Sequence, residues 1–185
     1  MFYPQKYSLL EWKQKGIAET HAIYQYEPKE PENPITALIR AFKAGNSEIG
    51  QALGQVMGEY ALKMKRIDVI VPIPGDPERN KTRGFNPPFI LAFEISRITG
   101  IPMKEVISRT SCSRAYHTKK SILEPCYSAT SITGNILLVD DVIATGKTKR
   151  ICANLLKKAG AKSITVLTIA KTNEKRWSRQ LKFSF

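Results

Sequence analysis

The chain contains little cysteine, and none of it is spaced to hold a metal. The three cysteines among 185 residues are Cys112, Cys126 and Cys152, and no Cys-x-x-Cys pair occurs. An odd number of cysteines at wide spacing supports neither a zinc module nor a disulfide framework. We therefore expect free thiols in a reducing compartment.

Long apolar runs are also missing. No stretch approaches the roughly 20 residues that a membrane-spanning helix needs, and residues 1–6 lack the apolar core of a signal peptide. We expect a cytoplasmic protein without a membrane span. The chain's 185 residues, 42% hydrophobic and 24% charged, suffice for one domain with a hydrophobic core.

Acidic residues are scarce relative to basic ones. The chain has 16 Asp and Glu against 29 Lys and Arg, which gives a net charge of +13. An excess of this size suits an anionic partner, either nucleic acid or a small polyphosphate. Most of the cations fit an ordinary solvated surface, but two clusters are denser, at 79–83 and 171–182.

Apolar patterns alternate along the chain between buried strands and amphipathic helices. Strands are predicted at 21–26, 67–72, 104–108, 136–140 and 163–169, and helices at 35–43, 49–64, 87–99 and 148–158. Residues 108–134 form a long polar connection. The alternation predicts an α/β fold with a mostly parallel sheet, in which ligands bind beyond the carboxyl ends of the strands. One predicted helix carries glycines spaced for close packing, at Gly50, Gly54 and Gly58.

One stretch carries most of the chemistry, from Asn135 to Thr148. An apolar strand from Ile136 to Val139 ends in two carboxylates, Asp140 and Asp141. Backbone N–H groups at a helix N-terminus bind phosphate, hydroxyls add donors, and carboxylates accept hydrogen bonds from sugar hydroxyls. The stretch therefore predicts a site for a phosphorylated sugar. Its phosphate loop, which opens a helix, is Ala144, Thr145, Gly146, Lys147 and Thr148.

Two other interpretations of this stretch compete with a sugar-phosphate site. Thr-Gly-Lys-Thr is similar to part of a nucleotide-binding P-loop, but the spacing is wrong because Asp141 rather than glycine stands five residues before Gly146. The acidic pair could also be a solvated turn or a helix cap, and that alternative stays open.

A basic loop over residues 78–86 is predicted after the strand 67–72. Arg binds phosphate oxygens through two parallel hydrogen bonds, and Lys acts as a point charge. Cations leaving a strand end can therefore neutralise a pyrophosphate, although a basic surface loop is the alternative. The acidic pair at another strand end favours the binding function, and Asn86 can cap the next helix. The candidate pyrophosphate residues are Pro74, Gly75, Arg79, Lys81 and Arg83.

These two stretches resemble a known family. A hydrophobic strand, Asp-Asp, two apolar residues and Ala-Thr-Gly-x-Thr are similar to the phosphoribosyl pyrophosphate (PRPP) motif of type I phosphoribosyltransferases. Val-Pro-Ile-Pro, a basic stretch and Arg-Gly-Phe-Asn resemble the ComF-like branch of that family, as do an early strand with Tyr24 and a helix ending at Lys43. The match covers roughly residues 22–171 by motif order.

The resemblance implies a fold and an activity. It implies one three-layer α/β domain over 1–185, with helices on both faces of a mostly parallel central sheet, a small hood or edge segment at 1–34 and a basic aromatic tail at 172–185. The implied enzyme is a phosphoribosyltransferase that moves the phosphoribosyl group of PRPP to an acceptor with release of pyrophosphate. Mg²⁺ is the implied cofactor, and competence and DNA uptake are the implied biology.

The resemblance also assigns roles to the candidate residues. Asp140 and Asp141 hold the ribose hydroxyls and, through water, the Mg²⁺, and they count with Arg83 as the catalytic residues. The loop 144–148 cradles the 5′-phosphate, and the basic segment stabilises pyrophosphate. No nucleophilic side chain is required, so we expect His21 to be structural and Cys152 to lie in the core.

Departures from the ComF-like pattern leave a second function open. Many members carry an N-terminal four-cysteine zinc module and, before the PRPP strand, a Gln and an Arg-x-x-Asn. Here the segment 109–120 offers only Arg109 and Arg114 for part of that role. The alternative is a non-catalytic module that keeps the PRPP pocket and acts through nucleic acid or a protein partner.

The tail adds to this alternative. Its cations are interleaved with Trp177, Phe183 and Phe185, which could stack on single-stranded DNA or pack on the domain. The candidate partners are therefore PRPP or another phosphorylated ribose, single-stranded DNA, a competence-machinery protein and a second copy of the chain as a homodimer.

Overall fold

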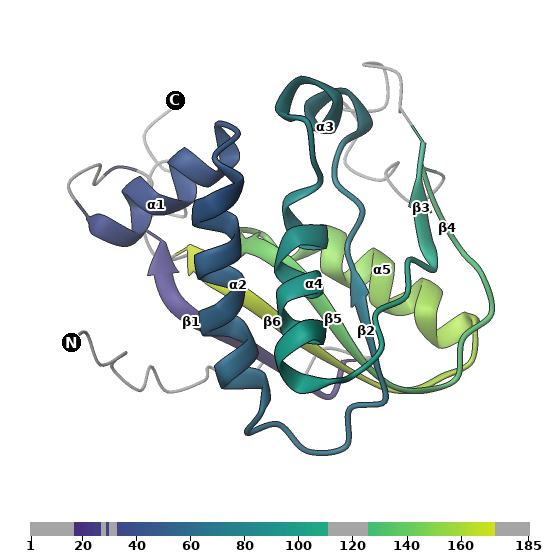
Figure 1. Ribbon diagram of the computed structural model, residues 1–185. Helices are drawn as coiled ribbons and strands as arrows, with labels where there is room; N and C mark the ends of the chain where they lie inside the picture. The colour runs from purple at the N-terminus through teal and green to yellow at the C-terminus, as the bar shows by residue number, and fades with distance from the viewer. Residues whose placement is uncertain (1–16, 27–28, 30–32, 111–125, 173–185) are drawn as a thin grey trace, which may run out of the picture.

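The computed structural model describes residues 17–26, 29, 33–110 and 126–172 (Figure 1). Its elements in chain order are β1 (Glu19–Tyr26), α1 (Pro34–Lys43), α2 (Ser47–Ala61), β2 (Val69–Pro72), α3 (Pro77–Arg83), α4 (Pro87–Thr99), β3 (Ile107–Arg109), β4 (Tyr127–Ala129), β5 (Gly134–Ile143), α5 (Lys147–Lys158) and β6 (Ala161–Thr172). Much of the predicted hood and nearly all of the predicted tail lie outside the described residues, as do Cys112, Arg114 and His117.

Within the described ranges, the central sheet has the strand order β1-β6-β5-β2, and each neighbouring pair is parallel. A single backbone bridge between Ile70 and Met103 extends the pairing past β2. The carboxyl ends of the strands therefore share one edge of the sheet, the upper edge in Figure 1, where α3 stands. The strand at 21–26 is confirmed as an edge strand.

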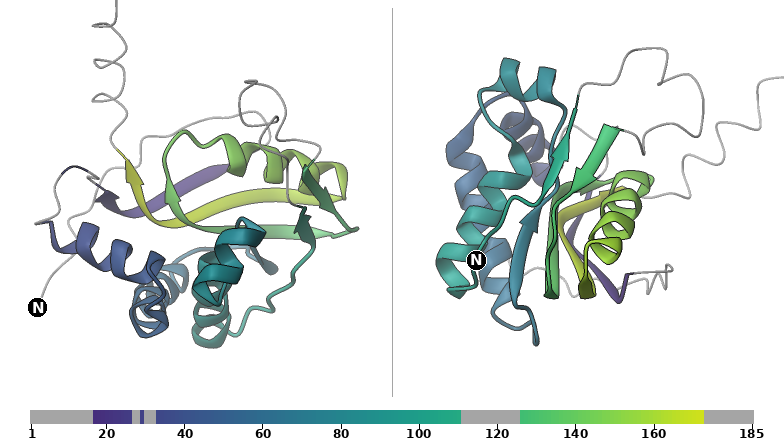
Figure 2. Two further views of the ribbon diagram at one scale, coloured as in Figure 1. Left: turned by 90° about the horizontal axis from the view of Figure 1, so that it is seen from above. Right: turned by 90° about the vertical axis from the view of Figure 1, so that its right-hand side faces the viewer.

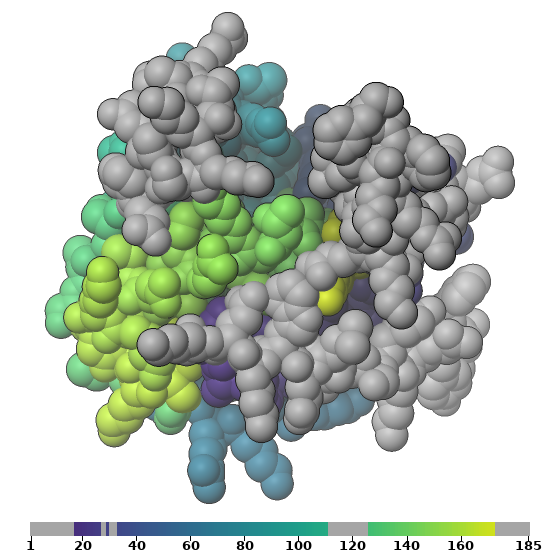
Figure 3. Space-filling view, turned by 180° about the vertical axis from the view of Figure 1, so that it is seen from behind, coloured from purple at the N-terminus to yellow at the C-terminus, as the bar shows by residue number. Residues whose placement is uncertain are grey.

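Alternating side chains build a core on each face of the sheet. On one face the strands pack against α1, α2 and α4 through residues that include Ile70, Leu137 and Leu167. On the other face Val71 and Leu138 pack against α5. Each fully buried side chain of this kind contributes roughly 1.5–3 kcal/mol. The sheet lies between two helical layers (Figure 2), and α5 forms much of the outer surface behind it (Figure 3). The predicted three-layer α/β fold is confirmed.

The predicted close packing of α2 is also confirmed. A Cβ atom placed on Gly54 would lie 2.6 Å from Cβ of Glu94 in α4, and one on Gly50 would lie 2.2 Å from the ring of Phe42 in α1. Gly58 likewise faces α4. Because protein cores tolerate little overpacking, these glycines set how closely the helices approach.

Residues 77–83 form a short helix, α3, so the prediction of a loop over 78–86 is wrong for most of that segment. The Asp76 side chain accepts a hydrogen bond from Arg79 N–H at 3.3 Å, and Pro77 stands in the first turn. Gly84 ends the helix with φ at 88°. A capping residue, an early proline and a closing glycine are start and stop signals of a helix, and here they coincide with a basic cluster.

The third predicted strand differs from the structure. It was expected at 104–108 in the series of sheet strands, but β3 spans Ile107–Arg109 and pairs antiparallel with β4. These two strands form a separate ribbon beside the main sheet. The ribbon partner β4 lies inside the predicted polar connection, where three residues give too short a pattern to recognise. The remainder of that connection, 111–125, is outside the described residues.

Two expectations drawn from missing features have different outcomes. Cys152 has a free thiol and is fully buried, as expected of a core residue. Cys126 is disulfide-bonded, so the expectation of free thiols is wrong for that residue. Among the helices that the structure describes, none combines the length and the apolar character needed to cross a bilayer.

Candidate functional site

The acidic stretch and the basic segment leave neighbouring strands. β2 pairs with β5 so that Pro72 stands opposite Val139, and Ile73 N–H donates to the Val139 carbonyl oxygen at 2.9 Å. The loop 73–76 therefore runs beside Asp140 and Asp141. The two halves of the predicted site meet at the carboxyl edge of a parallel sheet, where ligands bind in α/β folds.

The acidic pair lies within β5 rather than after it. The strand was expected to end at Asp140, but it continues to Ile143, which is 2% exposed. Pairing with β6 continues along this extension, and Thr168 Oγ1 donates to the Asp141 carbonyl oxygen at 2.7 Å. The alternative interpretation as a solvated turn or helix cap is therefore wrong. A strand fixes both carboxylates more rigidly than a turn would.

Charge is balanced unevenly within the pair. Lys43 Nζ, from the end of α1, lies 3.0 Å from Asp141 Oδ2. Burial raises the pKa of Asp140 well above the usual range of an aspartate, and the negative charge of Asp141 raises it further. A hydrogen bond from the Asp141 backbone N–H at 2.9 Å and the charge of Lys43 act in the opposite direction. The site thus holds one paired carboxylate and one that resists ionisation in the free protein.

Replacing Asp140 by Asn is expected to stabilise the free protein at neutral pH. Because the folded-state pKa lies above the unfolded value, the folded protein keeps a proton that the unfolded chain has lost. Stability therefore falls as pH rises from about 4 through the folded-state pKa. Asn cannot ionise but still accepts the Asp141 N–H bond. We therefore expect a higher free energy of unfolding at pH 7 in Asp140→Asn than in wild type.

Thermal unfolding between pH 4 and 8, with EDTA present, measures this effect. The exposed Glu105→Gln variant is the matched control for loss of one acidic group. Equal slopes of stability against pH in wild type and Asp140→Asn would contradict the assignment.

The phosphate loop turns sharply into α5. Gly146 stands at the N-cap with φ at 69°, and a Cβ there would lie 2.8 Å from Cε of Lys149. The Thr145 hydroxyl accepts a hydrogen bond from Lys147 N–H at 3.4 Å. Lys149 is 2% exposed and donates to Thr20 Oγ1 of β1 at 3.4 Å. The loop presents the positive end of a 12-residue helix, which suits a phosphate group.

The predicted pyrophosphate loop, residues 73–76, is held from behind by the side chain of Asn86. Gly75 N–H donates to Asn86 Oδ1 at 3.0 Å, and Asn86 Nδ2 donates to the Ile73 carbonyl oxygen at 3.3 Å. Asn86 stands at the N-cap of α4 but makes no side-chain cap bond, so the expected capping role is wrong. A Cβ on Gly75 would lie 2.6 Å from Asn80 Oδ1. A side chain at position 75 would therefore displace the amide groups of Asn80 and Asn86.

The predicted cations stand on α3, above this loop. Arg79 and Lys81 are exposed, whereas Arg83 is half-buried. Arg83 Nε donates to the Lys43 carbonyl oxygen at 2.7 Å, which joins α3 to the end of α1. Arg83 thus positions the lysine that pairs with Asp141, and direct binding of pyrophosphate by these cations stays a prediction.

Curated proteins from several bacteria are similar in sequence to this chain. No family model matches the chain. The competence protein ComFC of Bacillus subtilis (strain 168) is 31% identical over 162 residues, which cover 84% of this chain and 65% of that protein. The DNA utilization protein YhgH of Escherichia coli (strain K12) is 28% identical over 154 residues, which cover 75% of this chain and 68% of that protein. The chain is a ComF-like protein.

The match spans about two thirds of the length of these curated relatives, 65% of ComFC and 68% of YhgH. Among solved structures, a purine phosphoribosyltransferase from Pyrococcus horikoshii Ot3 is similar to 66% of this ComF-like chain and 72% of that chain. The TM-score is 0.44 at 24% identity. The fold assignment rests on the strand order β1-β6-β5-β2 of the parallel sheet.

Three residues of the site in this ComF-like protein were not named as site residues from the residue pattern alone. Lys43 pairs with Asp141, Asp76 pairs with Arg109 at 2.8 Å, and Tyr127 lies under the Arg109 guanidinium, 5.4 Å from ring centroid to Cζ. The only sequence signal was a lysine at the end of a predicted helix. Arg109, suggested for part of the Arg-x-x-Asn role, does lie at the site.

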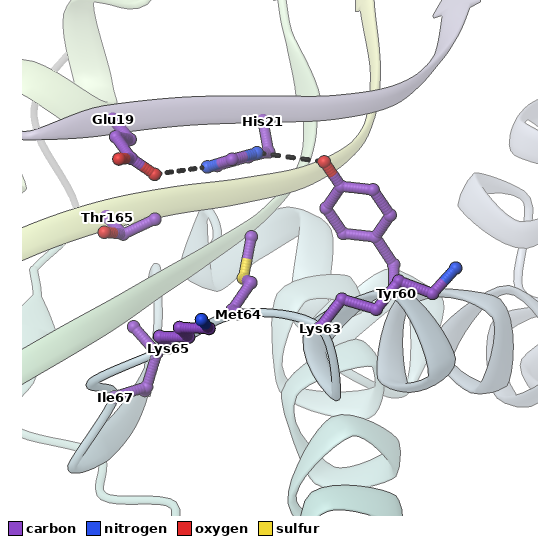
Figure 4. Close-up of a pocket in the computed structure, with 8 residues that line it drawn as sticks. All are labelled: Glu19, His21, Tyr60, Lys63, Met64, Lys65, Ile67 and Thr165. Carbon is purple, nitrogen blue, oxygen red and sulfur yellow. Dashed lines mark hydrogen bonds and ion pairs between the residues drawn. The ribbon is translucent and has the colours of Figure 1, made fainter. Parts of the chain in front are cut away.

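A cavity of about 260 Å³ lies away from the candidate site, beside the amino-terminal end of β1 (Figure 4). His21, 8% exposed, contacts Tyr60 Oη through Nδ1 and Glu19 Oε2 through Nε2, both at 3.0 Å. Thr165 and the end of α2 complete the lining. Both ring nitrogens have partners, and the contact with Tyr60 ties β1 to α2, which accords with the structural role expected of His21.

Proposed function

We propose that this ComF-like protein binds PRPP and transfers its phosphoribosyl group to an acceptor, releasing pyrophosphate. The observation that carries the proposal is the register of β2 with β5. It places a glycine-backed loop, an acidic pair and a hydroxyl-rich helix start at one edge of the sheet. PRPP has three parts, a pyrophosphate, a ribose and a 5′-phosphate. The loop, the acidic pair and the helix start match these parts in that order.

Each group of residues has a distinct task in this proposal. The first turn of α5, with the hydroxyls of Thr145 and Thr148, binds the 5′-phosphate, because backbone N–H groups at a helix N-terminus and hydroxyl groups donate hydrogen bonds to an anion. Asp140 and Asp141 accept hydrogen bonds from the ribose hydroxyls. The loop 73–76 and the cations beside it take the pyrophosphate, whose charge grows as the bond at C1 breaks. Stabilising that developing charge is electrostatic preorganisation.

The residues present fit Mg²⁺ in one particular way. The described residues contain no group of three or more His, Cys, Asp or Glu that could enclose a metal ion. Mg²⁺ is commonly held by one or two carboxylates, several waters and substrate phosphates, and Asp140 with Asp141 matches that donor set. When bound, the metal would neutralise charge on the pyrophosphate oxygens.

Calorimetric titration of the full chain with PRPP and Mg²⁺ tests the proposal. We expect saturable binding, followed by release of pyrophosphate when the right acceptor is present in a screen of nucleobases and amines. Inorganic phosphate is the control ligand, because it lacks the ribose that the acidic pair recognises. Absence of PRPP binding would refute the proposal.

A second candidate function is supported by the names of the relatives and by the charge. Competence protein and DNA utilization protein are the names of the matched relatives, and the net charge here is +13. A module acting through single-stranded DNA would show an affinity that falls steeply with salt and would decline on deleting 172–185. Salt-dependent DNA binding without pyrophosphate release for any acceptor would favour this function.

A further inference from the structure

Two buried polar atoms near the pyrophosphate loop lack hydrogen-bond partners. Among the described residues, Asn80 Oδ1 and Arg109 Nε are the buried side-chain atoms in this condition. Both belong to residues that surround Gly75 and Asp76. A native protein rarely leaves such atoms unpaired, and a functional site is one of the usual reasons.

Arg109 is held in a fixed place by its neighbours. Its guanidinium covers the ring of Tyr127, with Cζ 5.4 Å from the centroid. Burial raises the pKa of Tyr127, whereas the charge of Arg109 and a hydrogen bond with the Thr148 side chain lower it. Arg109 therefore stands between the pyrophosphate loop and the phosphate loop. Its side chain is 16% exposed.

Asp76 occupies only part of the binding edge of Arg109. Nη2 donates to Asp76 Oδ2 at 2.8 Å, while Nε, on the same edge of the guanidinium, has no partner among the described residues. An anion with two suitably spaced oxygens would engage both nitrogens, as phosphate groups do with arginine. A single carboxylate oxygen therefore fills one half of a two-point anion site.

We propose that Asp76 is an internal competitor for the pyrophosphate group of PRPP, holding Arg109 through one contact until the ligand takes both nitrogens. The inference rests on the proposed function, because it names the residues that regulate access to the same site. Displacement leaves Asp76 in place, since its other oxygen accepts the Arg79 N–H bond that caps α3. The loop keeps its shape while Arg109 changes partner.

The carboxylate lowers pyrophosphate affinity in two ways. It occupies Nη2, and it repels an incoming anion. Asp76→Asn removes the charge but keeps an oxygen for the α3 cap, because Asn is as good an N-cap as Asp. We expect this variant to bind inorganic pyrophosphate about 3- to 10-fold more tightly, as loss of a competing ion pair worth about 1 kcal/mol allows.

The test is a calorimetric titration of the full chain with inorganic pyrophosphate. Glu78→Gln, an exposed residue two positions along α3, is the matched control for the same change in charge. Arg109→Lys keeps the charge of Arg109 but lacks the planar pair of donors. We expect Asp76→Asn to tighten binding in the wild-type background and to have no such effect with Arg109→Lys. Circular dichroism confirms that each variant is folded, and Asp76→Ser replaces Asp76→Asn if it is not.

The outcomes separate this inference from the proposed function. If wild type binds PRPP but Asp76→Asn gains no more affinity for pyrophosphate than Glu78→Gln does, Asp76 is not a competitor. The proposed function is then unaffected. A gain that persists in Arg109→Lys also overturns the competitor role, because the effect would then be general repulsion. Pyrophosphate binding by Asp76→Asn but not wild type supports it even if wild type fails to bind PRPP. Failure of both proteins to bind pyrophosphate overturns it.

Discussion

Replacing Asp140 and Asp141 together by Asn is expected to reduce PRPP affinity about 100-fold or more, since each hydrogen bond to a charged group contributes about 1.5–3 kcal/mol. The two carboxylates lie in a paired part of β5, beside the loop that follows β2. Asn keeps the size of each side chain but cannot supply the negative charge. It also leaves the charge of Lys43 without the partner it has at 3.0 Å.

Calorimetric titration with PRPP and Mg²⁺ measures the loss. The matched control is the double variant Glu59→Gln and Glu105→Gln, which removes two exposed acidic groups elsewhere. Circular dichroism should show the same fold in all three proteins, because each Asn keeps an oxygen that can accept the hydrogen bonds from the Asp141 and Val142 N–H groups. If the Asp140→Asn, Asp141→Asn variant binds PRPP as tightly as wild type does, the assignment of the acidic pair to the PRPP site is wrong.

Replacing Gly54 by Leu is expected to cost about 3 kcal/mol of stability, the upper part of the range for overpacked cores. The first atom of the new side chain would lie 2.6 Å from Cβ and 2.9 Å from Cγ of Glu94. Glu94 is 6% exposed and bound to Arg97 at 2.8 Å, so it has little room to move. α2 would have to separate from α4.

Chemical denaturation of wild type and variant measures this cost. Gln55→Leu adds the same side chain to the exposed side of the same helix and should change stability by less than about 0.5 kcal/mol. A Gly54→Leu variant that is as stable as wild type, or more stable, would show that the gain in helix propensity outweighs the packing conflict with α4.

The parts of the site that the sequence predicted are those encoded locally. The apolar run before Asp140 predicts a buried strand, and the small loop before Lys147 predicts a helix start. That the ends of β2 and β5 meet follows from the rule that parallel strands share a carboxyl edge. No contact between distant residues had to be known for these inferences.

The parts that the sequence did not predict depend on tertiary position. Lys43 reaches Asp141 only because α1 ends above the sheet, and nothing in the pattern of α1 sets its direction. Arg109 reaches Asp76 because three residues of β3 pair with three of β4. Runs this short have no readable periodicity. α3 was predicted as a loop because none of its residues is buried, so the segment lacks the apolar stripe by which a helix is recognised in a sequence.

The pairing of β1 with β6 at the edge of the sheet determines when the sheet can finish folding during synthesis. β1 pairs in parallel with β6, which spans Ala161–Thr172. The first described strand therefore cannot pair until the last one has been synthesised. During synthesis, residues 19–26 leave the ribosome long before their pairing partner exists. Contacts between such distant segments slow folding, and an unpaired edge is prone to association with other chains. The nascent chain therefore carries an unpaired strand until nearly all described residues have been made.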